Sequence, residues 1–193
     1  IAVCGMGTIG LMVVMLLKEQ GFSNIYVLGK SEAQREKAKS LGISPEFFCN
    51  SRETDPVKWL NEKTNGEGID LYFECVGSNE SIRYGIDAGA HGASLVMVGN
   101  PRGDIELLKD TYWKILRREM KLFGIWNSEY WSGRSELSRD ESIDDWSYIL
   151  KLIKENKIHP ENLISHRLSI DDLLKGFLIM RDKTEDYTKV MMV

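Results

Sequence analysis

Three glycines near the start of the chain have the spacing of a dinucleotide-binding turn. They are Gly5, Gly7 and Gly10, with Thr8 and Ile9 between the last two. In such a turn the first glycine allows a tight bend from strand to helix, the second lets the backbone approach a pyrophosphate, and the third lets the helix lie close on the strand. The amides at the helix N-terminus then face the anion. We therefore predict that this segment binds the phosphates of a dinucleotide.

The end of the second expected strand bears on which dinucleotide is bound. NAD-binding turns place Asp or Glu about 20 residues after the glycines to hold the ribose hydroxyls, and here Gly29 occupies that place, followed by Lys30 and Ser31. A carboxylate would repel a 2′-phosphate, whereas a nearby cation and a helix N-terminus attract one. The pattern favours NADP over NAD, and Arg35 would assist if its helix turns it towards the site. The alternative is that Ser31 only caps the helix, Lys30 only faces water, and NAD is bound.

Composition and charge exclude several classes of protein. Of the 193 residues 42% are hydrophobic and 28% are charged, and the net charge of −4 creates no field that would gather nucleic acid. The longest apolar run, residues 9–17, is shorter than the ~20 residues that span a bilayer, so we expect no membrane segment, and no export signal is apparent. The three cysteines and three histidines lack the spacing of a metal site or a disulfide framework. We expect the cysteines to be small core residues of a cytoplasmic protein.

Apolar runs alternate with helical patterns over most of the chain. This alternation is typical of an α/β fold of the Rossmann type, a doubly wound parallel sheet with helices on both faces. The expected strands are residues 1–4, 25–28, 46–49, 69–75, 94–98 and 122–126. The expected helices are residues 8–20, 32–41, 56–64, 80–88 and 111–118. Residues 127–140 resemble a surface loop, and a helix and strand extension follows, with helices near 142–156 and 171–180 and a last strand at 189–193.

Several segments together resemble the cofactor-binding part of a zinc-type medium-chain alcohol dehydrogenase. They are CGMGTIG at the start, FECVG at 73–77, LVMVGNP at 95–101, KILRREMKLFGIW at 114–126, LISHR at 163–167 and the closing KVMMV. The resemblance covers nearly the whole chain, and within the family it is greatest to galactitol-1-phosphate and sorbitol-type dehydrogenases. It implies an NAD(P)-binding domain over residues 1–156. Residues 157–193 would help to complete a catalytic domain.

The resemblance also implies roles for particular residues. Two loops would contact the nicotinamide and its ribose: one consists of Cys75, Val76 and Gly77, the other of Val98, Gly99 and Asn100. A third loop, Trp126 with its neighbours, would border the nicotinamide and the substrate pocket. The family's catalytic zinc ligands precede the glycine motif. Because the chain begins with Ile on a core strand, we expect a piece of a longer protein that holds cofactor without zinc or activity. A homodimer or homotetramer is implied, and we expect pairing through an edge strand at residues 104–108.

The resulting hypothesis is an enzyme of the EC 1.1.1 type that transfers hydride between a polyol or sugar-alcohol phosphate and a nicotinamide cofactor. A zinc-independent enzyme like the quinone reductases is one alternative, and only the upstream residues would decide it. A non-catalytic dinucleotide-sensing domain is another, because the glycine turn alone would allow it. A methyltransferase is a third alternative, but such an enzyme would usually hold the ribose with an acidic residue at the end of the second strand, and Gly29 cannot serve in that role.

Overall fold

The structure is a computed structural model, and it describes residues 1–101, 103–126 and 144–193. Contacts divide the chain into two units, Ile1–Ile125 and Trp126–Val193. The boundary expected after residue 156 concerns the catalytic domain of a longer chain and stays a prediction. Among the described residues no helix is long and apolar enough to cross a membrane.

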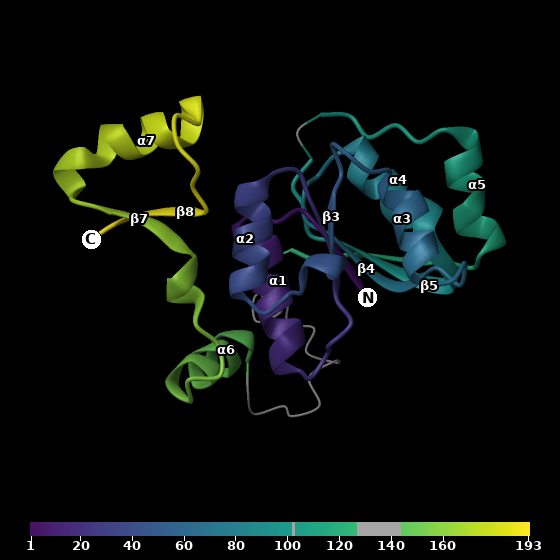
Figure 1. Ribbon diagram of the computed structural model, residues 1–193, viewed down its shortest axis with the longest axis horizontal. Coiled ribbons are helices and arrows are strands. Elements are labelled where there is room, and N and C mark those ends of the chain that lie inside the picture. Colours follow the sequence, from purple (N-terminus) through teal and green to yellow (C-terminus); the bar gives the residue numbers. More distant parts are fainter. Residues whose placement is uncertain (102, 127–143) are drawn as a thin grey trace. The chain divides into compact units, whose positions relative to one another are not determined.

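The first unit is built on six parallel strands in the order β3-β2-β1-β4-β5-β6 (Figure 1). The strands are β1 Ala2–Cys4, β2 Tyr26–Gly29, β3 Phe48–Asn50, β4 Ile69–Glu74, β5 Gly89–Met97 and β6 Lys121–Gly124. The chain builds the sheet outward from β1 in one direction through β2 and β3, and then in the other direction from β4 to β6. Because β1 pairs in parallel with β2 and β4, the carboxyl ends of these three strands lie at the same edge, next to this switch point. The Rossmann-type α/β fold is confirmed, and such a crevice is where open parallel sheets bind ligands.

Helices cover both faces of this sheet. They are α1 Thr8–Glu19, α2 Glu32–Ser40, α3 Pro56–Lys63, α4 Asn79–Ala88 and α5 Lys109–Arg117. In Figure 1, α1 and α2 lie on one face, and α3, α4 and α5 lie on the other. Three of these helices have an N-cap residue whose short polar side chain accepts a hydrogen bond from a backbone amide of the first turn. Ser31 caps α2, Asp55 caps α3 ahead of Pro56, and Ser78 caps α4.

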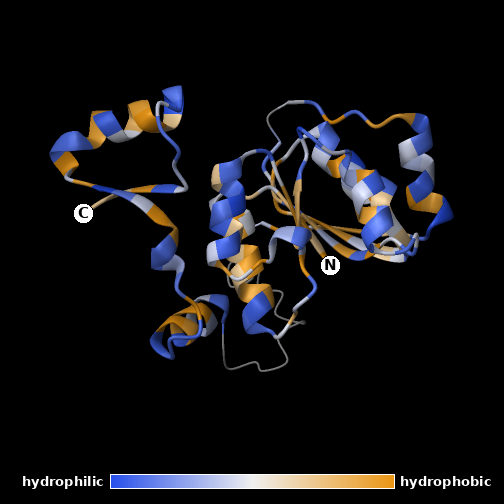
Figure 2. Cartoon of the chain, viewed as in Figure 1, coloured by the Kyte–Doolittle hydropathy of each residue, from blue (hydrophilic) through white to orange (hydrophobic). Residues whose placement is uncertain are grey.

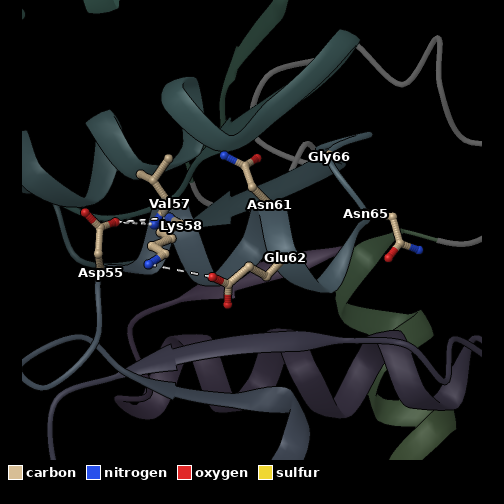
Figure 3. Close-up of a pocket in the computed structure, with 7 residues that line it drawn as sticks. All are labelled: Asp55, Val57, Lys58, Asn61, Glu62, Asn65 and Gly66. Carbon is tan, nitrogen blue, oxygen red and sulfur yellow. Dashed lines mark hydrogen bonds and ion pairs between the residues drawn. The ribbon is translucent and has the colours of Figure 1, made fainter.

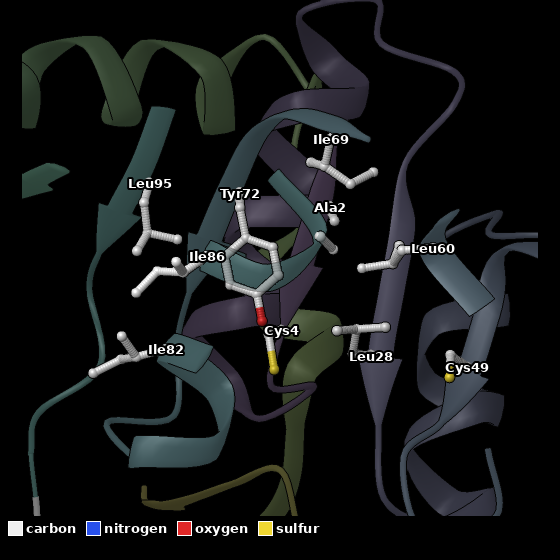
Figure 4. Close-up of a cluster of buried hydrophobic side chains, with 11 residues drawn as sticks. Ala2, Cys4, Leu28, Cys49, Leu60, Ile69, Tyr72, Ile82, Ile86 and Leu95 are labelled. Atoms are coloured by element: carbon white, nitrogen blue, oxygen red, sulfur yellow. The ribbon is translucent and has the colours of Figure 1, made fainter. Parts of the chain in front are cut away.

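The core beneath α3 and α4 is a single apolar cluster (Figure 4). Tyr72 lies within it at 1% exposure, and its hydroxyl donates to the carbonyl of Ser81 at 2.8 Å, so the one polar atom of this side chain is satisfied. Cys4 and Cys49 are buried here as expected, whereas Cys75 is only half-buried.

The second unit holds α6 Asp145–Lys154, β7 Ile164–Leu168, α7 Leu173–Asp182 and β8 Lys189–Met192. β7 and β8 pair in parallel as a two-stranded sheet. Figure 2 shows apolar residues over much of α6 and α7, and several are strongly exposed, among them Trp146, Leu150, Leu174 and Phe177. Since two strands alone bury little apolar surface, the described part of this unit leaves much of its apolar surface uncovered.

Some expected elements differ from those observed. A 3₁₀ turn at Pro45–Phe47 delays β3, because the chain is still turning where a strand was expected from residue 46. β5 begins at Gly89, five residues earlier than expected. Residues 104–108 form no strand, so the expected edge there was wrong, and β6 is the edge of the sheet on that side. The expected loop at residues 127–140 and the start of the helix at 142 lie outside the described residues.

Candidate functional site

The glycine turn leads directly from β1 into α1. Gly5 has a φ of +99°, which only glycine adopts readily, and its amide donates to the carbonyl of Leu28 at 2.9 Å. A β-carbon on Gly10 would lie 1.8 Å from the carbonyl oxygen of Gly5. α1 therefore packs on the end of β1 at a distance that no side chain at residue 10 permits.

Gly7 differs from its two neighbours because nothing lies within 4 Å of the place where its β-carbon would be. It is the N-cap of α1, no side chain caps that helix, and no acidic residue stands in its first turn. The positive end of the helix dipole is thus unopposed by a carboxylate of its own first turn. The space above Gly7 and the amides beside it can accept an anion such as a pyrophosphate.

The loops that follow β4 and β5 pack against this turn and against each other through glycine. A β-carbon on Gly5 would meet Val76 at 2.7 Å and the carbonyl oxygen of Cys75 at 3.1 Å. One on Gly77, whose φ is +76°, would lie 2.0 Å from the carbonyl oxygen of Asn100. The structure therefore brings the glycine turn and two of the predicted loops, residues 75–77 and 98–100, together at the carboxyl ends of β1, β4 and β5.

Gly99 lies at the centre of the contact between the β4 and β5 loops. A β-carbon there would approach the amide of Gly77 at 2.4 Å and that of Val76 at 2.6 Å. The amides of Val98 and Gly99 both donate to the carbonyl of Glu74 at 2.9 Å. These contacts leave the two loops little freedom to move independently.

Glu74 contacts the candidate site, and the sequence-based prediction missed it. It ends β4, is 1% exposed, and its carboxylate accepts the amide of Val76 at 2.7 Å and the amide of Gly77 at 2.9 and 3.1 Å. The only signal in the sequence was an acidic residue inside the apolar run FECVG. A buried acid in a core strand needs hydrogen-bond partners, and the following loop supplies them.

The segment after β2 is held by its own helix. The hydroxyl of Ser31 accepts the amide of Gln34 at 3.3 Å, and the side chain of Gln34 accepts the amide of Lys30 at 2.7 Å. The ammonium of Lys30 lies 3.9 Å from a carboxylate oxygen of Glu80, which belongs to α4. Ser31 is thus a helix cap, and Lys30 has an acidic neighbour from the other side of β1.

Two aromatic or cationic neighbours complete this end of the site. A β-carbon on Gly29 would lie 2.6 Å from the ring of Phe48, so no side chain fits there without movement. The guanidinium of Arg35 stacks over the same ring at 5.0 Å and lies 3.1 Å from a carboxylate oxygen of Glu32.

Trp126, the remaining predicted site residue, is 74% exposed and belongs to the second unit.

A separate hollow runs along α3 (Figure 3). Its volume is about 640 Å³, and it is lined by Asp55, Val57, Lys58, Asn61, Glu62, Asn65 and Gly66, none of them a predicted site residue. Its carboxylates are already engaged, since Asp55 accepts two α3 amides and Glu62 lies 3.9 Å from the ammonium of Lys58. This hollow is a surface groove beside one helix.

The cysteines and the potential metal ligands form no reactive centre among the residues that the structure describes. Burial raises the pKa of Cys4 and of Cys75 to about 12 and that of Cys49 to about 11, so their thiols stay neutral at ordinary pH. In residues 1–101, 103–126 and 144–193, no three His, Cys, Asp or Glu side chains gather as a metal ion would require. The residues described here do not fit a catalytic zinc.

Known proteins with similar sequences are dehydrogenases. L-threonine 3-dehydrogenase from Bacillus subtilis (strain 168) is 29% identical over 180 residues, which cover 93% of this chain and 47% of that protein. Sorbitol dehydrogenase from Halalkalibacterium halodurans is 26% identical over 179 residues, which cover 92% of this chain and 47% of that protein. The chain thus spans about half the length of the curated relatives it matches.

A solved structure and a family model agree with these relatives. Galactitol-1-phosphate dehydrogenase from Escherichia coli matches with a TM-score of 0.79 and 25% identity, covering 96% of this chain and 51% of that one. The family model described as zinc-binding dehydrogenase matches residues 8–142. The chain therefore belongs to the zinc-binding dehydrogenase family.

Proposed function

We propose that the chain is the dinucleotide-binding half of a dehydrogenase that transfers hydride between a secondary alcohol and a nicotinamide cofactor. The observation that carries the proposal is the glycine-packed junction of the β1, β4 and β5 loops beside the open N-terminus of α1. The turn from Gly5 to Gly10 would hold the pyrophosphate, and residues 75–77 and 98–100 would bound the nicotinamide. When bound, the cofactor accepts or releases the hydride.

The proposed substrate is a polyol or a sugar-alcohol phosphate, with galactitol 1-phosphate as the first candidate. The galactitol-1-phosphate dehydrogenase structure and the sorbitol dehydrogenase sequence support this choice. Zinc would be held by residues outside those described, and when bound there it would polarise the hydroxyl as a Lewis acid. The exposed apolar side chains of α6 and α7 support such a further domain, because they offer a surface for it to cover.

The proposal is tested first by binding. Calorimetry of the 193-residue chain with NADPH and NADH should show one site, and Gly7→Val should abolish it while the circular dichroism spectrum is retained. Failure of the wild-type chain to bind either dinucleotide would contradict the proposal. For the complete protein, zinc content and the oxidation rates of galactitol 1-phosphate, sorbitol and threonine would separate the polyol enzyme from a zinc-independent one and from a sensor.

The proposed cofactor is NADP in preference to NAD. The absence of a carboxylate at Gly29 supports this choice, and so do Lys30 and the N-terminus of α2, because both would attract a 2′-phosphate. The carboxylates of Glu80 and Glu32 beside Lys30 and Arg35 oppose this attraction. Because Lys30 is half-exposed, we expect a preference of only about threefold to tenfold.

The ratio of dissociation constants for NADH and NADPH tests this preference. Lys30→Ala should lower the ratio, whereas Glu80→Gln should raise it by removing the competing carboxylate. Gly29→Asp is a poor test, since its β-carbon would collide with Phe48. Equal affinities in the wild type, or a ratio that neither variant changes, would show that Lys30 only faces water.

The chain is further proposed to form a homodimer in the cytoplasm. All four residues of β6 are exposed at a sheet edge that no described strand pairs with, and Leu122, Phe123 and Ile125 expose apolar surface there. Such an edge pairs readily with a second copy. Light scattering should therefore show a dimer that Phe123→Lys dissociates, and a monomer at high concentration would contradict this. The three unpaired cysteines are compatible with a reducing compartment.

A further inference from the structure

Glu74 is a buried carboxylate whose charge is not balanced by a side chain in the described part of the structure. It is 1% exposed, and none of the ion pairs among those residues includes it. Burying a carboxylate without hydrogen bonds or a counter-charge is strongly unfavourable. The amides of the loop that follows must therefore supply its stabilisation.

The hydrogen bonds of Glu74 connect it to both loops proposed to face the nicotinamide. One carboxylate oxygen accepts the amides of Val76 and Gly77 at 2.7 and 2.9 Å, and the other accepts Gly77 at 3.1 Å. Its backbone carbonyl accepts the amides of Val98 and Gly99 at 2.9 Å. One residue thus bonds the β4 loop through its side chain and the β5 loop through its backbone.

These bonds determine how the peptide planes of the β4 loop are turned. Since each peptide is planar and trans, an amide that points at Glu74 directs the carbonyl of the preceding residue the opposite way. The Val76 and Gly77 amides face inward, so the carbonyls of Cys75 and Val76 are turned away from Glu74. The carbonyl of Cys75 is at the surface of the glycine turn, 3.1 Å from where a β-carbon of Gly5 would lie.

We propose that Glu74 is a positioning residue that orients residues 75–77 for the nicotinamide half of the cofactor. The proposal rests on the proposed function, in which this loop bounds the nicotinamide and the α1 turn holds the pyrophosphate. Glu74 acts through the backbone of its neighbours and touches no reacting atom. Its loss should weaken binding of a ligand that carries nicotinamide more than binding of one that ends at the ribose.

Three substitutions separate hydrogen bonding from charge and from size. Glu74→Leu fills similar space but leaves two inward amides without an acceptor. Glu74→Asp keeps the charge but draws the carboxylate back by one methylene, so the loop would have to shift to keep the bonds of 2.7 and 2.9 Å. Glu74→Gln removes the charge and keeps one oxygen, which can accept both bonds now made to the closer carboxylate oxygen. Gln should therefore rescue what Leu and Asp lose.

The experiment measures dissociation constants of the 193-residue chain for NADH and for ADP-ribose, which lacks nicotinamide. Leu and Asp should weaken NADH by about tenfold or more and ADP-ribose by less than about twofold, and Gln should stay within about threefold of wild type for both. Asp87→Asn is the matched control. Asp87 is a largely buried carboxylate that pairs with Arg83 and Lys114, so this variant should melt earlier with an unchanged affinity ratio.

The possible results separate this proposal from the proposed function. Equal weakening of both ligands, no weakening in Asp, or a Gln variant as weak as Leu would overturn the positioning role. A wild type that binds ADP-ribose as tightly as NADH would also overturn it, while leaving the pyrophosphate turn intact. A wild type that binds neither ligand would overturn the proposed function itself. If Leu does not fold, as melting would show, the comparison of Asp with Gln decides.

Discussion

Gly7 and Gly10 stand three residues apart in one turn, yet an added methyl group should affect them in opposite ways. A methyl at residue 10 would lie 1.8 Å from a backbone oxygen, where ordinary contact begins at 3.4 Å. Overpacking of this kind costs about 1–3 kcal/mol, and the obstacle here is backbone that cannot turn aside. The better helix propensity of Ala returns about 1 kcal/mol. With the overpacking cost at the upper end of that range, we expect Gly10→Ala to lose about 2 kcal/mol net, or ~4–8 °C in melting temperature.

Gly7→Ala should leave stability nearly unchanged. Its φ of −88° and ψ of −170° are open to alanine, and nothing lies within 4 Å of the new methyl group. The smaller entropy of the unfolded chain and the poorer N-cap roughly offset each other, so the change should stay within about 0.5 kcal/mol. The methyl group would stand where a pyrophosphate must approach, and affinity for NADPH and NADH should fall at least about tenfold.

Thermal melting and calorimetry on the two variants give a decisive pair of results, each variant serving as the control for the other. Loss of affinity without loss of stability at Gly7, and loss of stability at Gly10, would support the assignment of the turn. Retained affinity in Gly7→Ala would refute the idea that the pyrophosphate approaches there. A Gly10→Ala variant that melts like wild type would refute the reasoning from close packing.

Three further changes test other parts of the structure. Thiol-specific reagents should label the folded chain slowly at pH 8, because pKa values of about 11–12 leave no more than about one thiol in a thousand ionised. Rapid labelling at pH 8 would contradict this burial. The free energy of unfolding should fall between about pH 9 and 12, where the thiols of the unfolded chain ionise and those of the folded chain do not. Asp55→Ala should lower the melting temperature by ~2–4 °C, because α3 loses its N-cap, and should leave the affinity for dinucleotide unchanged. Weaker dinucleotide binding by this variant would instead show that the groove along α3 contributes to the binding site. Arg118→Ala removes a guanidinium that donates to the carbonyls of Ile86, Asp87 and Gly89, so melting should fall by ~4–8 °C, and an unchanged melting temperature would show that water replaces it.

The local patterns of the sequence were enough to predict the sheet and the turn. Each strand of the first unit overlaps a short apolar segment, and helix caps such as Ser31 and Asp55 mark where helices begin, so periodicity and capping together located most of these elements. Residues 104–108 were misjudged because an edge strand depends on a partner elsewhere in the sheet. That segment is tied instead through the amide of Glu106 to the side chain of Asn79.

The contacts that join the loops could not be predicted from the sequence, because they depend on tertiary packing. Gly77 and Gly99 are far apart in the chain, and only the parallel pairing of β4 with β5 places them against each other. The counter-charge of Lys30 is similarly non-local, since Glu80 reaches it from the opposite side of β1. Spacing predicts which residues bind a dinucleotide, whereas the proposed preference for NADP over NAD also depends on charges such as Glu80, which only the fold brings near Lys30.

Glu74 shows how a functional interpretation can follow from an energetic conflict. Burying an acidic side chain in an apolar strand costs free energy unless hydrogen bonds or a counter-charge offset the loss of water. Here the carboxylate supplies acceptors to amides that the sharp turn at Gly77 would otherwise leave unpaired. A polar loop could satisfy those amides with water, but then the loop would be free to move. The buried acid keeps the loop rigid at the place where we propose that the cofactor binds.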